Sequence, residues 1–217
     1  MGVGGHGDDE LFAMVGVERR ALADDLEGLT PEQWATQSLC AEWTVREVAG
    51  HLTAAFLMSV PSLMLRIAKN LGNFNKAMSQ AAKELGQRPT EDIVATIRDH
   101  ADDRFTPPGN GPEAPLTDLI VHGQDIRRSL GLHRAFPAEA LAVALEATHA
   151  GLKGFVPKGR VVGLSYRATD IDWSGGSADG AALEGPAEAL LLAICGRTVA
   201  LADLTGDGVE VLGARIR

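Results

Sequence analysis

Cysteine is scarce in this sequence, which limits the classes of protein to which it can belong. Its 217 residues include two cysteines, Cys40 and Cys195, which lie far apart and form no CxxC pair. A disulfide framework of the kind that holds small secreted domains together is therefore not expected. We expect both cysteines to be small, buried apolar residues, and we expect a cytoplasmic location.

Long apolar runs and basic clusters are also missing. Pro61, Arg66 and Lys69 interrupt one of the most apolar stretches, so no segment has the length that a membrane crossing needs. The chain has 20 basic and 29 acidic residues, a net charge of −9, whereas nucleic-acid binding depends on clustered basic side chains. We therefore expect a soluble monomer or homodimer that has no membrane or nucleic-acid partner and acts on small molecules.

Helical patterns dominate the first two thirds of the chain. Apolar residues recur at helical spacing from Leu11 to Leu29, and the pairs Thr30/Gln33 and Thr44/Glu47 are typical of capping boxes that begin helices. The second box begins the helix TVREVAGHLTAAF, which Pro61 is expected to kink or end. Three further helices are predicted, from Pro89 to about Phe105, through PLTDLIVHGQDIRRSL to Leu130, and from Pro137.

After Pro157 the pattern changes. The segment RVVGLSYRATDIDWS alternates and is rich in β-branched and aromatic residues, which favours a strand. A polar turn SGGSADG, a short apolar helix GPAEALLLAICGR and a last strand DGVEVLG are then predicted. The sequence thus predicts two domains, a helical bundle over 1–156 and a small C-terminal α/β domain over 157–217 that docks on it.

Three residues form a candidate metal site. Asp118 and His122 stand four apart, which places them on one face of a helix, and His51 lies in an otherwise apolar stretch where its ring needs a partner. A third ligand from a neighbouring antiparallel helix would complete an open set of the kind that catalytic zinc sites use. Because an Asp and a His at this spacing are common without metal, the position of His51 is the feature that favours a site.

Two nearby carboxylates are alternatives. Asp125 lies on the same helix face as His122 and is the main rival to Asp118 as a ligand, although it also suits a supporting role beside the site or a pairing with Arg127 or Arg128. Glu47 stands four residues before His51, and its capping-box role explains it adequately.

Several of these segments resemble a known family. WTVREVAGHL, LTDLIVHGQDIRRSLG, ATDIDWS and EGPAEALLLAICGR are similar to the mycothiol-dependent maleylpyruvate isomerase family of the DinB-like superfamily. The resemblance implies a mostly α fold, with an up-and-down four-helix bundle and a small C-terminal α/β domain. It also implies a divalent metal, with zinc expected, on His51, Asp118 and His122. The enzyme that gives the family its name has a glutamate where this chain has Asp118.

The resemblance further implies an enzyme that uses the thiol of mycothiol for isomerisation or transfer on a small electrophilic substrate. The thiol comes from the cosubstrate, which fits a chain in which neither cysteine has an activating context in the sequence. Arg197 is the best candidate for the C-terminal arginine that the family isomerase uses for its acidic substrate. Two alternatives remain open, a non-catalytic metal-containing binding or regulatory module and a metal-assisted hydrolase.

Overall fold

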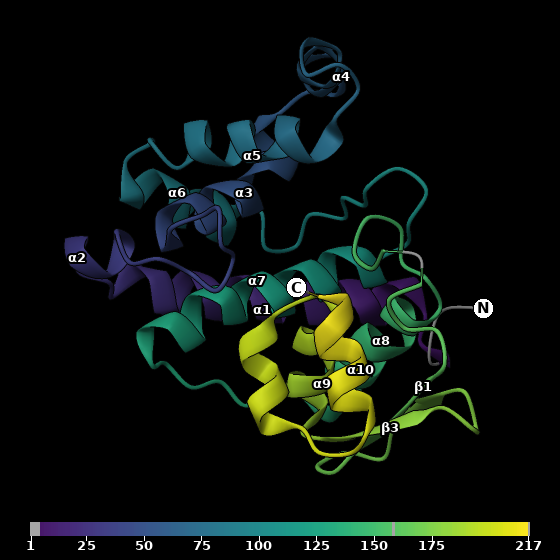
Figure 1. Ribbon diagram of the computed structural model, residues 1–217. Coiled ribbons are helices and arrows are strands. Elements are labelled where there is room, and N and C mark those ends of the chain that lie inside the picture. Colours follow the sequence, from purple (N-terminus) through teal and green to yellow (C-terminus); the bar gives the residue numbers. More distant parts are fainter. Residues whose placement is uncertain (1–4, 158, 217) are drawn as a thin grey trace. The chain divides into compact units, whose positions relative to one another are not determined.

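The computed structural model describes residues 5–157 and 159–216, which are mostly helical with one small mixed sheet near the C-terminus (Figure 1). This agrees with the predicted fold class. The described residues fall into two compact units. One unit contains the residues up to Met14, Thr106–Val121 and the residues from Ala135 onward, and the other contains Val15–Phe105 and His122–Arg134. The division into domains 1–156 and 157–217 remains a prediction.

The described residues up to Leu130 form seven helices, and the two longest, α1 and α7, each contribute residues to both units. Both predicted capping boxes are confirmed, since the side chains of Thr30 and Thr44 accept hydrogen bonds from the backbone N–H of Gln33 and Glu47. No helix in the described ranges has the length and apolar character to cross a membrane. The bounds are α1 (Asp8–Glu27), α2 (Pro31–Trp34), α3 (Val45–Leu57), α4 (Val60–Lys69), α5 (Phe74–Leu85), α6 (Thr90–Asp99) and α7 (Glu113–Leu130).

Close packing of α3 against α5 positions the middle of α3. A Cβ atom added to Gly50 would lie 2.5 Å from the backbone N of Gly86 and 2.8 Å from the carbonyl oxygen of Ala82. Only a residue without a side chain allows the two helix backbones to approach this closely. The unit that contains α3 and α5 has an apolar core, which includes Leu22, Leu26, Val48, Leu52, Ile93, Ile97 and Ile126.

Two helix ends differ from the prediction. The helix expected to reach about Phe105 ends at Asp99, because the chain turns there and presents the carbonyl oxygens of residues 100, 101 and 103 to the buried guanidinium of Arg19. The helix carrying His51 ends at Leu57, and Pro61 lies in the first turn of α4, where its missing N–H costs nothing.

The other unit holds α8 (Ala138–His149), the sheet and the last helices. Strand β1 (Leu164–Ala168) lies between β2 (Ser174–Gly176), which is antiparallel to it, and β3 (Ala181–Gly185), which is parallel to it. Helix α9 (Ala187–Ile194) is almost wholly buried and packs on α8 and on the sheet, as its apolar sequence predicts. A 3-10 turn (Thr198–Asp203) and α10 (Gly208–Arg215) follow.

Two predictions for this region are wrong. The segment DGVEVLG was expected to be a strand, but it begins α10, with Gly208 and Leu212 buried four residues apart while Val209 and Val211 are half-buried. A Cβ atom on Gly208 would lie 2.5 Å from Cδ1 of Leu183, so tertiary packing against β3 outweighs the local preference of the valines. The predicted turn SGGSADG is also shorter, because its first three residues form β2.

Candidate metal centre

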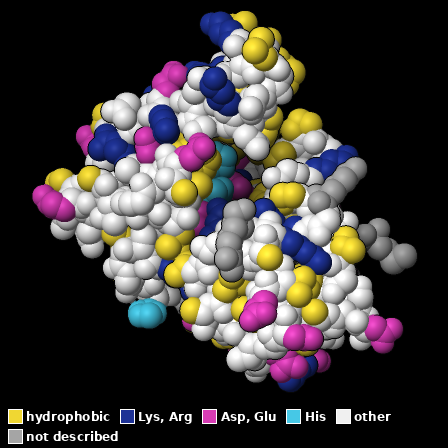
Figure 2. Space-filling view, viewed as in Figure 1, with side chains coloured by type: hydrophobic (Ala, Val, Ile, Leu, Met, Phe, Trp, Pro, Cys, Tyr) yellow, Lys and Arg dark blue, Asp and Glu magenta, His cyan; other side chains and the backbone are white. Residues whose placement is uncertain are grey.

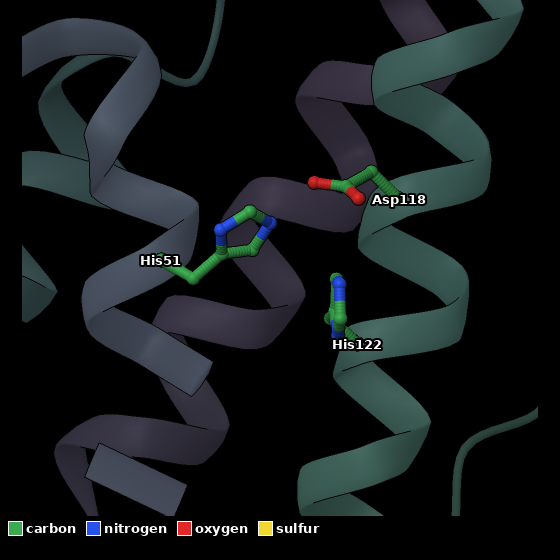
Figure 3. Close-up of side chains that lie close together, drawn as sticks. All are labelled: His51, Asp118 and His122. Atoms are coloured by element: carbon green, nitrogen blue, oxygen red, sulfur yellow. The ribbon is translucent and has the colours of Figure 1, made fainter. Parts of the chain in front are cut away.

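The three predicted ligand residues come from two helices. His51 is in the middle of α3, and Asp118 and His122 are one turn apart on the uninterrupted helix α7. Each offers a donor atom, and these three atoms all lie within 4.8 Å of one another. Figure 3 shows His51 pointing toward the pair on α7. The structure therefore brings together the histidine, carboxylate and histidine that the sequence predicts as a set.

Aromatic contacts hold the two imidazoles in place. The rings of His51 and His122 meet edge to face with centroids 4.8 Å apart. The Trp43 indole stacks on His51 at 4.9 Å and lies 5.7 Å from His122. Its Nε1 donates to the Ser79 hydroxyl at 3.3 Å, which anchors the indole itself. Trp43 thus restricts both rings from one side.

Asp125 contacts Nδ1 of the His122 ring. Oδ2 of Asp125 lies 2.9 Å from Nδ1 of His122, and the Asp125 side chain has no exposed surface. A carboxylate in this position favours the tautomer with hydrogen on Nδ1, which leaves Nε2 as the donor atom for a ligand. Asp125 therefore has the supporting position that the sequence left open, and Asp118 is the carboxylate in the set with both histidines.

Buried ionic contacts fix the second half of α7. Nε of Arg127, whose side chain is 1% exposed, donates to Oδ2 of Asp25 on α1 at 2.6 Å. The backbone carbonyl of Asp125 also accepts from the N–H of Leu39 at 3.1 Å, in the loop that leads to Trp43. These contacts hold His122 and Asp125 in register with the helices of their own unit.

The donor set suits a divalent transition metal. Two neutral imidazoles and one carboxylate are the ligands found in catalytic zinc sites that keep a position open, and imidazole also suits iron, nickel and copper. His51 and Asp118 are half-buried, so neither ligand residue is fully enclosed by the protein. Chemically, such a site can hold a cation and present it to a thiol, a water molecule or a substrate oxygen.

Other residues singled out in the sequence have different surroundings. Glu47 has its predicted capping role, since its carboxylate accepts from the Thr44 N–H at 2.8 Å. Cys195 is buried and Cys40 half-buried. Two arginines lie near the Cys195 backbone: Nη1 of Arg197 donates to its carbonyl oxygen at 2.8 Å, and Nη1 of Arg160 donates to the carbonyl oxygen of Ile194 at 3.2 Å. The fold of the loop before β1 brings Arg160 there.

Trp43 is the residue that sequence reasoning missed. It stands eight positions before His51, inside a segment that the resemblance includes, but no spacing rule links a loop residue to a helix residue at that distance. The available signal was the tryptophan itself, since a hydrophobic residue just before a helix N-cap often packs against the start of that helix. Its position over His51 and His122 depends on the turn between Cys40 and Trp43, closed by a hydrogen bond of 3.0 Å.

The fold and the donor set together define a helical protein with a candidate divalent-metal site. Residues 15–106 match the model of the mycothiol maleylpyruvate isomerase N-terminal domain, whose fold is DinB-like. The predicted resemblance is thereby confirmed for a segment that contains His51, whereas Asp118 and His122 lie beyond it. Neither the curated proteins nor the solved structures include a match to the chain.

Proposed function

We propose that this protein is a divalent-metal-dependent enzyme that uses a low-molecular-weight thiol, mycothiol, for transfer or isomerisation on a small electrophilic substrate. The observation that carries the proposal is the set of donor atoms on His51, Asp118 and His122, all within 4.8 Å of one another. The family match over residues 15–106 supports the thiol as cosubstrate. Zinc is the metal that the two imidazoles and the carboxylate fit best.

Each residue of the site has a separate task in this proposal. His51, Asp118 and His122 hold the ion, and Asp125 keeps Nε2 of His122 available by accepting from Nδ1. A divalent cation favours the thiolate form of a thiol beside it, and so makes a nucleophile available at neutral pH. Trp43 restricts the rings of both histidines, so that little reorganisation accompanies binding.

The chain's own cysteines have no nucleophilic role in the proposal. Cys195 is buried in the C-terminal part of the chain, and Cys40 lies in the loop before Trp43. Arg197 is proposed to bind the acidic group of a substrate, as the family resemblance implies, and its guanidinium donates to the Cys195 carbonyl just after α9. Its replacement by lysine should raise KM for an acidic substrate more than it lowers kcat.

Metal content is the first test. The purified protein should contain about one divalent ion per chain, and His51→Ala and His122→Ala should each lose it while His133→Ala, in an exposed loop, keeps it. Full occupancy in both site variants, measured by elemental analysis of folded protein, would place the metal elsewhere and remove the basis of the proposal.

The second test separates thiol chemistry from hydrolysis and from a purely binding role. The metal-loaded protein is incubated with a generic electrophile, with and without mycothiol, and conjugate formation is followed by mass spectrometry. Turnover that requires mycothiol supports the proposal. Turnover of an ester substrate without thiol supports a metal-assisted hydrolase, in which the ion activates water instead. Ligand binding without any turnover supports a binding or regulatory module.

A further inference from the structure

The segment Leu57–Lys76 has an unusual surface. Ten large hydrophobic residues in the described part of the chain are exposed, and six of them lie in this short segment. Leu71 is 98% exposed at the turn after α4, and Phe74 is 51% exposed at the start of α5. Exposed apolar side chains are ordinary when scattered, but a concentration of them marks an interaction site. The six residues are Leu57, Val60, Met64, Leu65, Leu71 and Phe74.

Helix α4 has apolar residues on two faces. None of its residues is fully buried, and its main packing partner is α5. Leu63 and Ile67 are half-buried, whereas Val60, Met64 and Leu71, at spacings of four and seven, are mostly exposed. Val60 and Met64, one turn apart, therefore lie on one face of the helix, and Leu71 follows in the turn, where its φ of 55° is no longer helical. The protein itself therefore covers only one apolar side of α4.

Charge in this region is opposite to the charge of the whole protein. Between Glu47 and Glu84 the chain has no acidic residue and four basic ones, although the net charge of the protein is −9. Arg66 pairs with Glu84 at 2.7 Å. Lys69 and Lys76 are exposed and, in the described part of the chain, form no ion pair. Figure 2 shows hydrophobic side chains gathered over α4, with basic side chains beside them. We call the six apolar residues with Lys69 and Lys76 the basic apolar patch.

We propose that the basic apolar patch docks on a membrane surface that contains anionic lipids, with α4 lying in the plane of the interface. An amphipathic helix that carries Leu, Met or Phe beside Lys or Arg binds such surfaces through apolar burial and attraction to lipid headgroups. The expectation of no membrane partner rested on the length that a crossing helix needs, and a surface contact has no such requirement. The proposal is independent of the metal site and of the proposed enzymatic function.

Other occupants fit the patch less well. A two-fold contact with a second copy would place Lys69 and Lys76 of both copies in the same small interface, where like charges repel. The core of an interface with another protein is depleted in lysine, whereas a membrane interface tolerates lysine between apolar side chains because the ammonium reaches the headgroups. The mixture of Lys69, Leu71, Phe74 and Lys76 within eight residues therefore favours lipid.

The test measures co-sedimentation of the full chain with vesicles. Phosphatidylcholine vesicles containing phosphatidylglycerol should bind the protein, pure phosphatidylcholine vesicles should bind it much less, and added salt should weaken the binding. Met64→Ser/Leu65→Ser and Lys69→Glu/Lys76→Glu should each lower the partition coefficient at least about tenfold. The controls are Val162→Ser/Val199→Ser and Lys153→Glu, which change exposed apolar and basic residues outside the patch and should bind like the parent protein.

All five proteins are first compared by circular dichroism and thermal unfolding, because exposed substitutions should leave the fold intact. Absence of binding to the anionic vesicles overturns the proposal. So does equal loss of binding in the control variants. If sedimentation velocity shows a dimer that the patch variants dissociate, the patch is an interface between copies. If the protein binds polyglutamate but no vesicles, its partner is an acidic polypeptide.

Discussion

Nδ1 of His122 lies 2.9 Å from Oδ2 of Asp125, one turn along α7, and the carboxylate has no exposed surface. A second pair of the same types and spacing, His100 and Asp103, has its Nδ1 and Oδ2 2.6 Å apart at a half-exposed position. The His100–Asp103 pair lies outside the candidate metal site, so comparing variants of the two pairs shows whether the Asp125 contact matters for metal binding.

Asp125→Asn should weaken metal binding by roughly 10-fold to 100-fold, because an amide is a weaker acceptor for the imidazole N–H that orients His122. Competition with a chromophoric chelator measures the affinity. Asp103→Asn is the matched control and should bind metal like the parent protein. Equal affinity in Asp125→Asn and the parent would show that the contact with His122 is merely structural.

Asp25→Ala should lower the free energy of unfolding by roughly 1.5–3 kcal/mol, because it removes a hydrogen bond from the buried guanidinium of Arg127. Asp24→Ala removes a partner of Arg98 on the solvent side of the same helix and should cost less than about 1 kcal/mol. Urea unfolding followed by circular dichroism gives the free energy of unfolding of both variants. Similar losses in the two variants would mean that the burial of Arg127 does not increase the contribution of its contact with Asp25 to the free energy of unfolding.

Gly50→Ala should destabilise the protein by about 1–3 kcal/mol, because the new methyl group must push the backbone of Gly86 away from α3. Gly28→Ala is the control, since the nearest atom to its added Cβ is 4.0 Å away. Thermal unfolding provides the comparison. A Gly50→Ala protein with the parent melting temperature would contradict the close approach of α3 and α5.

We expect the protein to lose stability at high pH because of its single tyrosine, Tyr166. Burial raises the pKa of Tyr166 from 10.0 to about 12, with Arg215 acting in the opposite direction. Between these values the unfolded chain releases the phenol proton and the folded chain keeps it, so this stabilisation is present below pH 10 and is lost as the pH rises through about 12. The loss should be roughly 3 kcal/mol and absent in Tyr166→Phe. Phenolate absorbance should show ionisation near pH 10 only in unfolded protein.

Activity should depend on added thiol and not on either cysteine. The variant Cys40→Ser/Cys195→Ser should turn over at the parent rate when mycothiol is supplied, with a modest loss of stability because Cys195 is buried. Steady-state rates normalised to metal content provide the measurement. An inactive but folded, metal-loaded variant would assign chemistry to a protein thiol, and the arginines near Cys195 would then be its first candidate activators.

Local signals in the sequence determined much of the helical structure. The hydroxyls of Thr30 and Thr44 reach N–H groups three residues ahead, so both helix starts were readable from residue types at fixed spacing. The same applies to Asp118 and His122, whose shared face follows from helix geometry alone. The buried helix α9 was readable from its apolar composition.

Tertiary structure decided what depends on partners distant in the chain. Local sequence could not tell that Gly208 and Leu212 pack on β3, and therefore the valines between them suggested a strand. The choice between Asp118 and Asp125 was likewise open, because both share a face with His122. The position of α3 favours Asp118, which has a donor atom within 4.8 Å of one on His51, while Asp125 contacts Nδ1 of His122. Spacing within one helix lists the residues on a face, but the packed neighbour determines which of them meet its side chains.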